Sequence, residues 1–388
     1  MIFSILTTKQ IGAIMEYFIE ISRIVEGALS GDKKRVLAYL EQLSKKLKRS
    51  GDESAADVLS KYLKNTGSDI ASISGISSSR LPVDSESRLS LADESCLHKG
   101  DVSIVMSRGI KEKVEEFLRY IKNSAKLITS GVGISPSMLM YGPPGVGKTE
   151  LARYIASELE LPLLTARTDS LISSYLGSTA KNLRLLFDHA NSCPCILFLD
   201  EFDAIAKLRD DQHELGELKR VVISLLQNID SLNHDTILLA ATNHDHLLDP
   251  AIWRRFTYRL EFSLPSLPER KQLIELFLKK YMTPQMNINL LADIASELSG
   301  ATIKQICKNA IRHAILLRRK TVDGDVLVKN FMLAKLPQEF SFDIKDHASL
   351  AIFNETFEGK ISQRKMAELF STSDATISRK INEVEVTQ

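Results

Sequence analysis

The sequence predicts an α/β protein whose central domain is built on a parallel β-sheet, with smaller all-α pieces at both ends of the chain. Two observations lead to this fold class. Short apolar runs alternate with helical patterns between about residues 100 and 264, and a Ser-rich tract separates this region from a helical start. Continuous apolar strands separated by helices are typical of parallel sheets that are covered on both faces.

Composition narrows the possible functions of the 388-residue chain. Hydrophobic residues make up 44% and charged residues 26%, as in globular proteins with a substantial core. The 50 Lys and Arg balance 49 Asp and Glu, which excludes a protein whose overall charge drives binding to nucleic acid or acidic lipid. The four Cys give no disulfide framework, and no apolar run approaches the ~20 residues of a membrane span. We therefore expect a cytoplasmic protein.

Residues 1–66 predict a helical N-terminal region. Apolar residues recur at three- and four-residue spacing from Ile11 to Val25, and Gly31-Asp32 separates them from a second, basic helix, so two helices are expected over residues 9–65. The start lacks the basic segment and cleavage site of a signal peptide, and Met15 is an alternative start. The basic helix is either a solvated surface or a face for nucleic acid or an acidic partner.

Residues 67–96 predict a flexible linker. Ten of the 28 residues from 68 to 95 are Ser, which leaves too little apolar surface to offset the cost of ordering the chain. An α/β core at 97–264, a helical region at 265–337 and a helical tail at 338–388 are expected to follow. The strands of the core are expected at MLMYG (138–142), LPLLTA (161–166), CILFLD (195–200), TILLAAT (236–242) and YRLEFSL (258–264).

The segment GPPGVGKT, residues 142–149, lies between a strand and a helix and fits the phosphate-binding pattern G-x-x-x-x-G-K-[ST]. Its glycines let backbone N–H groups approach phosphate oxygens, and the helix that begins at Lys148 directs its positive end at them. Lys148 can reach the β- and γ-phosphates, and the Thr149 hydroxyl can ligate Mg²⁺. The motif predicts an ATP and Mg²⁺ site formed by Gly142, Pro143, Pro144, Gly145, Val146, Gly147, Lys148, Thr149 and Glu150.

Two later strands end in polar residues. Asp200 and Glu201 follow the run ILFL, and Asn243 follows the run that ends at Thr242. Because open α/β sheets bind ligands at the carboxyl ends of their strands, these side chains are expected beside the phosphates. Asp200 would hold Mg²⁺, Glu201 would accept a proton from the attacking water, and Asn243 would orient that water.

Together these residues resemble the AAA family of ATPases, in the clade with a second region of homology. The family's Walker A, Walker B, sensor 1 and arginine-finger segments correspond, in order, to GPPGVGKT, ILFLDEFD, AATN and LDPAIWRRF, over about residues 100–337. The resemblance implies a P-loop NTPase fold with a five-stranded parallel sheet and a helical lid. It also implies a homo-oligomeric ring, usually of six subunits, that binds ATP between neighbours.

The resemblance assigns further residues. Arg254 or Arg255 is the finger that reaches the γ-phosphate of the next subunit; the family separates its two arginines by Pro-Gly, so the adjacent pair leaves the choice open, with Arg255 favoured. Gly300 and Ala301 would close over the adenine and ribose. Tyr175 and Leu176 correspond to a pore loop that grips an extended polypeptide, unless Tyr175 packs on its own loop.

A narrower resemblance suggests a partner. A helical start, a Ser-rich linker and LFLDEFDAI resemble bacterial AAA proteins often encoded beside a subtilisin-like protease, which implies such a protease as partner. Residues 361–381 resemble a helix-turn-helix, which leaves DNA contact and protein docking open.

The leading hypothesis is therefore an ATP-hydrolysing ring motor that remodels or threads a protein client. The alternatives are an ATP-controlled, DNA-associated regulator that uses the tail and an ATP-gated adaptor that assembles a partner enzyme.

Overall fold

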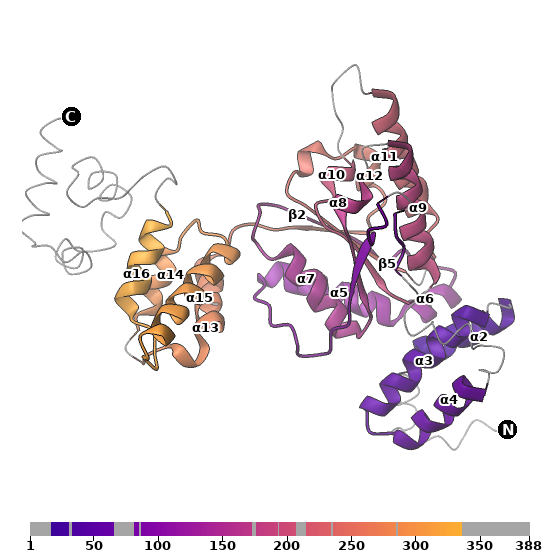
Figure 1. Cartoon of the computed structure of the whole chain (residues 1–388), viewed down its shortest axis with the longest axis horizontal. Helices are drawn as coiled ribbons and strands as arrows, with labels where there is room; N and C mark the ends of the chain where they lie inside the picture. Colours follow the sequence, from indigo (N-terminus) through magenta and orange to yellow (C-terminus); the bar gives the residue numbers. More distant parts are fainter. Residues whose placement is uncertain are drawn as a thin grey trace, which may run out of the picture. The chain divides into compact units, whose positions relative to one another are not determined.

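The computed structural model describes residues 17–30, 33–65, 81–84, 87–172, 176–192, 194–206, 215–233, 236–284 and 286–335 (Figure 1). The chain divides into two compact units. The first comprises residues 1–103, 111–142 and 148–261, and the second comprises residues 104–110, 143–147 and 262–388.

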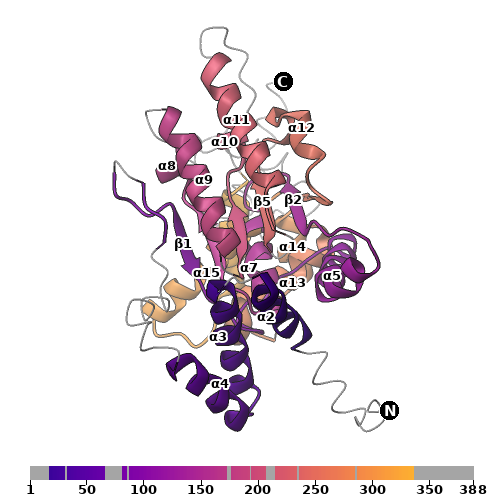
Figure 2. The same ribbon diagram turned by 90° about the vertical axis from the view of Figure 1, so that its right-hand side faces the viewer.

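The first unit is organised around a six-stranded sheet with the strand order β1-β3-β4-β5-β2-β6 (Figure 2). The five strands β2 to β6 are parallel, as predicted, and β1 adds an antiparallel edge next to β3. All five predicted strands are present. The strands are β1 Ala92–Ser95, β2 Ser137–Tyr141, β3 Leu163–Ala166, β4 Ile196–Leu199, β5 Ile237–Thr242 and β6 Tyr258–Glu261.

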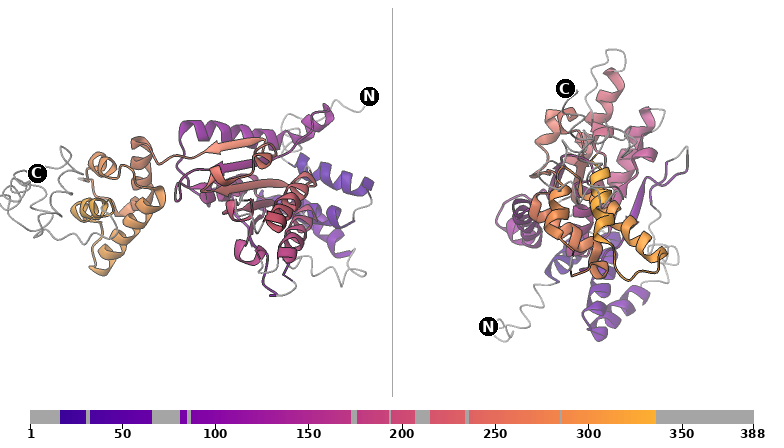
Figure 3. Two further views of the ribbon diagram at one scale, coloured as in Figure 1. Left: turned by 90° about the horizontal axis from the view of Figure 1, so that it is seen from above. Right: turned by 90° about the vertical axis from the view of Figure 1, so that its left-hand side faces the viewer.

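Burial explains why the central strands have continuous apolar sequences. Every residue of β4 and β5 is buried, because helices cover both faces of the sheet. Helices α9 (Leu176–Ser192) and α11 (Leu215–Asp230) lie on one face, and α5 (Arg108–Lys122) and α7 (Lys148–Leu159) lie on the other (Figure 3). The shorter helices of this unit are α6 Ser124–Thr129, α8 Thr168–Leu171, α10 Asp203–Ala206, η3 Asp245–Leu247 and α12 Pro250–Trp253.

The edge strand β1 corrects the predicted linker. Leu91 and Ala92 are fully buried, and Ala92–Ser95 pairs with β3, so the end of the stretch 67–96 belongs to the sheet domain. Asp84 is also buried and accepts a hydrogen bond from Asn182 Nδ2 at 3.1 Å. The Ser-rich composition did not indicate this strand, because an edge strand needs few apolar residues. Residues 66–80 lie outside the described part of the chain.

Three described helices precede the sheet, where the sequence predicted two. They are α2 Phe18–Ser30, α3 Lys33–Arg49 and α4 Glu53–Asn65. The additional break lies at Gly51, whose φ of 87° falls in the left-handed region that favours glycine.

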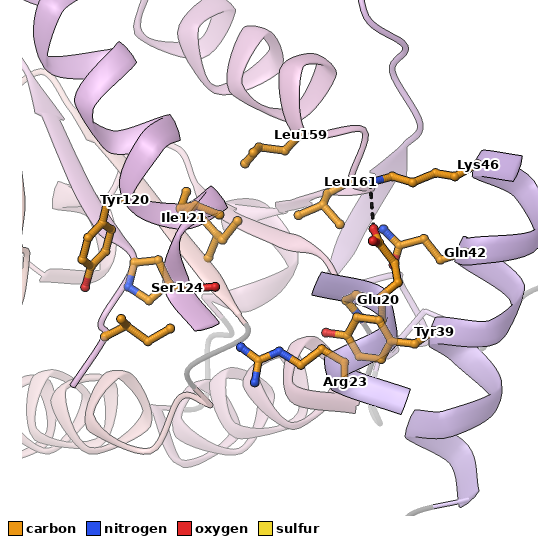
Figure 4. A pocket seen from close by; sticks show the side chains of 14 residues that line it. Glu20, Arg23, Tyr39, Gln42, Lys46, Tyr120, Ile121, Ser124, Leu159 and Leu161 are labelled. Atoms are coloured by element: carbon orange, nitrogen blue, oxygen red, sulfur yellow. Dashed lines mark hydrogen bonds and ion pairs between the residues drawn. The ribbon is translucent and has the colours of Figure 1, made fainter. Parts of the chain in front are cut away.

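Helices α2 and α3 meet the sheet domain around a small cavity of about 60 Å³ (Figure 4). Lys46 Nζ donates to Glu20 Oε1 at 2.7 Å, and Glu20 is only 3% exposed. Leu159 and Leu161 of the sheet domain line the same cavity. Since a buried carboxylate needs its cationic partner, this ion pair fixes α2 against α3 where both helices face the sheet domain.

The described helices of the second unit are α13 Leu267–Leu278, η4 Lys279–Tyr281, α14 Ile288–Ile294, α15 Gly300–Leu316 and α16 Gly324–Leu333. They fall within the predicted helical region 265–337 and share an apolar core of their own that includes Ile274, Leu291 and Phe331. The predicted tail helices at 361–381 lie outside the described residues. Within the described part of the chain, no helix combines the length and apolar character needed to cross a membrane.

Candidate nucleotide-binding site

The predicted phosphate loop joins the end of β2 to the start of α7. Gly142, Gly145 and Gly147 have φ values of 136°, 75° and 105°, which side-chain-bearing residues rarely adopt. The three glycines therefore set the path of the loop. Pro143, Pro144 and Val146 complete it, and Glu150 lies in the first turn of α7.

Lys148 is the first residue of α7, and it is 6% exposed. Its Nζ donates to the Gly142 carbonyl and to Asn243 Oδ1, both at 2.7 Å. Burial lowers the pKa of Lys148, and the negative charges of Asp200 and Asp203 oppose this shift. An incoming phosphate would stabilise the same ammonium group.

Thr149 and Asp200 meet at the carboxyl ends of β2 and β4. The Thr149 hydroxyl donates to Asp200 Oδ2 at 2.8 Å, so two of the oxygen ligands predicted for Mg²⁺ lie together. In the described part of the chain, no three His, Cys, Asp or Glu side chains form a metal cage. This donor set fits Mg²⁺, which is usually held by one or two carboxylates together with substrate phosphates.

Glu201, the predicted base, is exposed and has φ of 50°, a left-handed conformation that is uncommon for glutamate. Its backbone N–H donates to Asp200 Oδ1 at 3.0 Å. Such a conformation costs about 1–3 kcal/mol. The backbone thus presents Glu201 to solvent directly beside the Asp200 carboxylate.

Asn243 and the loop that carries it are tied to the loop after β4. Asn243 Oδ1 accepts a hydrogen bond from Lys148. The preceding residue, Thr242, donates through its hydroxyl to Asp203 Oδ1 at 2.7 Å. Asp203 and Thr242 stand in the motifs DEFD and AATN, but the motifs alone predict no role for either residue. Their only sequence signal was their position one or two residues from a predicted catalytic side chain.

Residues 143–147 of the loop belong to the second unit, and there they contact the start of α15. The Ala301 N–H donates to the Gly145 carbonyl at 2.9 Å. A Cβ added at Gly145 would lie 2.7 Å from Ser299 Oγ and 2.9 Å from Ala301 Cβ, so only glycine fits. Gly300 and Ala301, predicted to cover the nucleotide, thus lie beside this part of the loop.

The two adjacent arginines lie at the opposite edge of the sheet, where the parallel strands begin. Ser137, the first residue of β2, donates through its hydroxyl to the Arg255 carbonyl at 3.1 Å. The Arg255 guanidinium makes two bonds of 2.8 Å to the Asp230 carboxylate, which raises the pKa of Arg255. Arg254 is exposed, and among the described residues no hydrogen bond or ion pair holds its guanidinium.

The predicted pore-loop residues are only partly described. Tyr175 lies outside the described residues, and Leu176 is the first residue of α9, with its side chain undescribed. The role of Tyr175 and Leu176 as a pore loop therefore stays a prediction.

A glycine loop between a parallel strand and a helix, with Lys148 and Thr149 facing Asp200 and Asn243, defines a P-loop NTPase domain. Residues 138–264 match the family model of the ATPase family associated with various cellular activities (AAA). Residues 138–264 therefore form an AAA ATPase domain.

Two relatives extend the comparison. An uncharacterized AAA family ATPase of Sinorhizobium fredii is 41% identical over 222 residues, which cover 56% of this chain and 66% of the relative. The proteasome-activating nucleotidase of Saccharolobus islandicus is 32% identical over 244 residues, covering 60% of this chain and 62% of the relative. The matches thus span 62–66% of the length of these relatives.

Proposed function

We propose that this protein is an ATP-hydrolysing AAA motor that works as a ring of identical copies, six in the usual family arrangement, and that it remodels or threads a protein client. One observation carries the proposal. The residues suited to binding and hydrolysing ATP lie at the carboxyl edge of the sheet, and the arginine pair lies at the amino edge.

The distance between the edges is set by β2. Its residues Ser137–Tyr141 separate the Arg255 carbonyl contact from the glycine loop. At ~3.3 Å per residue, five residues of strand extend about 16 Å. Neither arginine would complete the ATP site of its own chain across that distance, so an arginine at this edge would serve the site of another copy.

Arg254 and Arg255 have different roles in this proposal. Arg255 is engaged by Asp230 and by the Ala251 carbonyl, to which its Nη1 donates at 2.9 Å. Arg254 is exposed at the same edge. We therefore assign the finger to Arg254, against the preference for Arg255 that the sequence suggested, and give Arg255 the task of holding the segment that carries it.

The chemistry follows from the groups at the carboxyl edge. Lys148 and the loop N–H groups bind the phosphates, and Thr149 and Asp200 would hold Mg²⁺, which when bound neutralises phosphate charge. Glu201 accepts the proton of the attacking water, and Asn243 orients that water. Arg254 from the neighbouring copy stabilises the negative charge that develops on the γ-phosphate.

Support for a protein client comes from the comparisons and the sequence. One relative is named for activating a proteasome, which favours an ATP-driven protein-unfoldase role at the family level. Tyr175 and Leu176, just before and at the start of α9, would grip the client. A subtilisin-like protease partner and a cytoplasmic location rest on the sequence alone. The DNA-regulator alternative depends on a tail that lies outside the described residues. The adaptor alternative needs no threading, so Tyr175→Ala would leave an adaptor working but disable a threading motor.

Mixing two inactive variants tests the shared site. Lys148→Ala removes phosphate binding but keeps Arg254, and Arg254→Ala keeps the phosphate loop but lacks the finger. Each variant alone should have little ATPase activity. An equimolar mixture should recover activity, up to ~25% of wild type if subunits assort randomly, since about one interface in four then combines both intact halves.

The readout is phosphate release, measured before and after mixing at a protein concentration at which mass photometry detects assemblies. A mixture that stays as inactive as its components, although the assemblies exchange subunits, would rule out an arginine acting between copies. Wild-type protein that hydrolyses ATP at the same specific rate as a strict monomer would rule out the ring.

A further inference from the structure

Two hydrogen bonds tie the loop after β4 to the end of β5, and a third closes the turn that follows β5. The Phe202 N–H donates to the Ala241 carbonyl at 2.8 Å, and the Thr242 hydroxyl donates to Asp203 Oδ1 at 2.7 Å. The same Thr242 oxygen accepts from the His244 N–H at 3.0 Å. The loop that carries Glu201 and the loop that carries Asn243 are thereby joined as one unit.

Thr242 is the last residue of β5 and is only 1% exposed. Its hydroxyl uses its single hydrogen on Asp203 and a lone pair on His244, so the orientation of the group is fixed. A threonine oxygen that accepts from the N–H two residues ahead makes a local turn, here around Asn243. Solvent cannot replace Asp203 as the partner of a hydroxyl this deeply buried.

The turn decides where the Asn243 amide lies. Asn243 Oδ1 accepts from Lys148 Nζ at 2.7 Å, which completes a continuous chain of contacts from Asp203 through Thr242 and Asn243 to the phosphate-loop lysine. The charge of Asp203 also acts on Lys148, although Asp203 lies on another loop.

From these contacts, and resting on the proposed ATPase function, we infer that Asp203 and Thr242 are positioning residues for ATP hydrolysis. They hold the Asn243 amide at the point where the γ-phosphate and the attacking water would meet. Neither residue needs to touch ATP. Their loss should therefore slow turnover without weakening ATP binding.

Thr242→Val tests the inference, because valine keeps the shape of threonine and removes the hydroxyl. We expect kcat to fall ~10- to 100-fold with an unchanged KM for ATP, the size of effect known for small misplacements of a catalytic group. Thr242→Ser restores the hydroxyl and should recover most of the loss. Asp203→Ala should match Thr242→Val, and the double variant should be no slower than either, since both changes break one link.

Thr236→Val is the matched control. Thr236 directly precedes β5, is 3% exposed, and its hydroxyl bonds the Ala190 carbonyl at 3.3 Å and Asn191 Oδ1 at 3.2 Å. The same substitution at the other end of one strand should change thermal stability to a similar degree and leave kcat at the wild-type value.

The outcomes separate this inference from the proposed function. Wild-type protein without ATP turnover would overturn the proposed function itself. Normal turnover by wild type and by Thr242→Val would overturn only the positioning role. Equal losses of kcat and of fluorescent-ATP affinity, or a failure of Thr242→Ser to recover kcat, would assign Thr242 to folding alone. If Thr242→Val does not fold, Asp203→Asn, which keeps an acceptor oxygen, should retain more turnover than Asp203→Ala.

Discussion

The two edges of the parallel sheet carry different kinds of chemistry. At the carboxyl edge, Lys148, Thr149, Asp200 and Asn243 are hydrogen-bonded to one another in pairs and so form a connected polar site. At the amino edge, one arginine is held by a carboxylate, and the arginine next to it is exposed. A site divided in this way can be completed by a second copy of the chain.

The pKa shifts of the basic residues also differ between the two edges. Burial lowers the pKa of Lys148, so its positive charge is costly until a phosphate arrives. The neighbouring Asp230 raises the pKa of Arg255, so that its charge is already balanced. The carboxyl edge is thus prepared to receive an anion, whereas Arg255 is already occupied. The exposed Arg254 beside it is the cation left to act elsewhere.

The largest expected effect in this comparison is at Glu201. Glu201→Gln should retain ATP binding, because Lys148 and the loop are intact, and should lose turnover by ~10²- to 10⁴-fold, the range for removal of a general base. Fluorescent-ATP binding and phosphate release, measured on one sample, check both parts. Glu261→Gln, the same change at the carboxyl end of β6, should have normal turnover. Normal turnover by Glu201→Gln would mean that the carboxyl edge lacks its proposed base.

Much of this arrangement was predictable, because its signals are local in the sequence. Runs such as ILFL and ILLAAT predict buried parallel strands, and the polar residue after each run then falls at the ligand-binding edge. The edge strand β1, with the sequence ADES, was missed because one face of it and its outer edge need no apolar residues. The break before α4 was missed because a single glycine, Gly51, makes it.

The relations that were missed in the site join residues far apart in the chain. Thr242 and Asp203 are 39 residues apart, and Arg255 and Asp230 are 25 residues apart. No pattern within either segment indicates the partner, so the sequence could not separate Arg254 from Arg255. Such pairs form only when the tertiary structure is in place, since Thr242 and Asp203 follow the neighbouring strands β5 and β4, and Asp230 ends α11 whereas Arg255 precedes β6.

A smaller effect should appear in the pH dependence of ATP binding. Burial lowers the pKa of Lys148 in the folded protein below the usual lysine value of ~10.4. Between the lowered pKa and the usual value, the folded protein without ATP therefore binds fewer protons than the unfolded chain. The stability of the folded protein rises with pH in this range. ATP needs the charged form, so its affinity should fall roughly tenfold per pH unit above the lowered pKa. Titration of fluorescent-ATP binding up to pH 10 measures this.

Lys148→Arg is the control for the pH effect. The guanidinium keeps its charge throughout that range, so whatever affinity this variant has should not depend on pH. If the affinity of the wild-type protein for ATP is constant up to pH 10, the lowered pKa of Lys148 is contradicted. The amino edge predicts no such dependence, because the raised pKa of Arg255 moves its titration further from the accessible range.

The smallest expected effect concerns the ion pair at the amino edge. Asp230→Asn should lower the free energy of unfolding by only about 0.2–1 kcal/mol, because the Asp230 side chain is 53% exposed and water screens the pair. Turnover should remain close to wild type, since Arg254 stays in place. Asp188→Asn, which removes the exposed partner of Arg184 on α9, is the matched control for stability. The stability difference should shrink in 1 M salt, in which charges are screened within ~3 Å.

Kinetics of the same variant then tests the division between the two arginines. If Asp230→Asn loses turnover as completely as Arg254→Ala, the reacting cation is Arg255 and Asp230 directs it to the neighbouring site. If turnover instead rises above wild type, Asp230 restrains an arginine that would otherwise act in catalysis. Either result would reverse the assignment of Arg254. Retained turnover would support the assignment in which Arg255 holds the segment in place and Arg254 reaches the ATP site of the neighbouring copy.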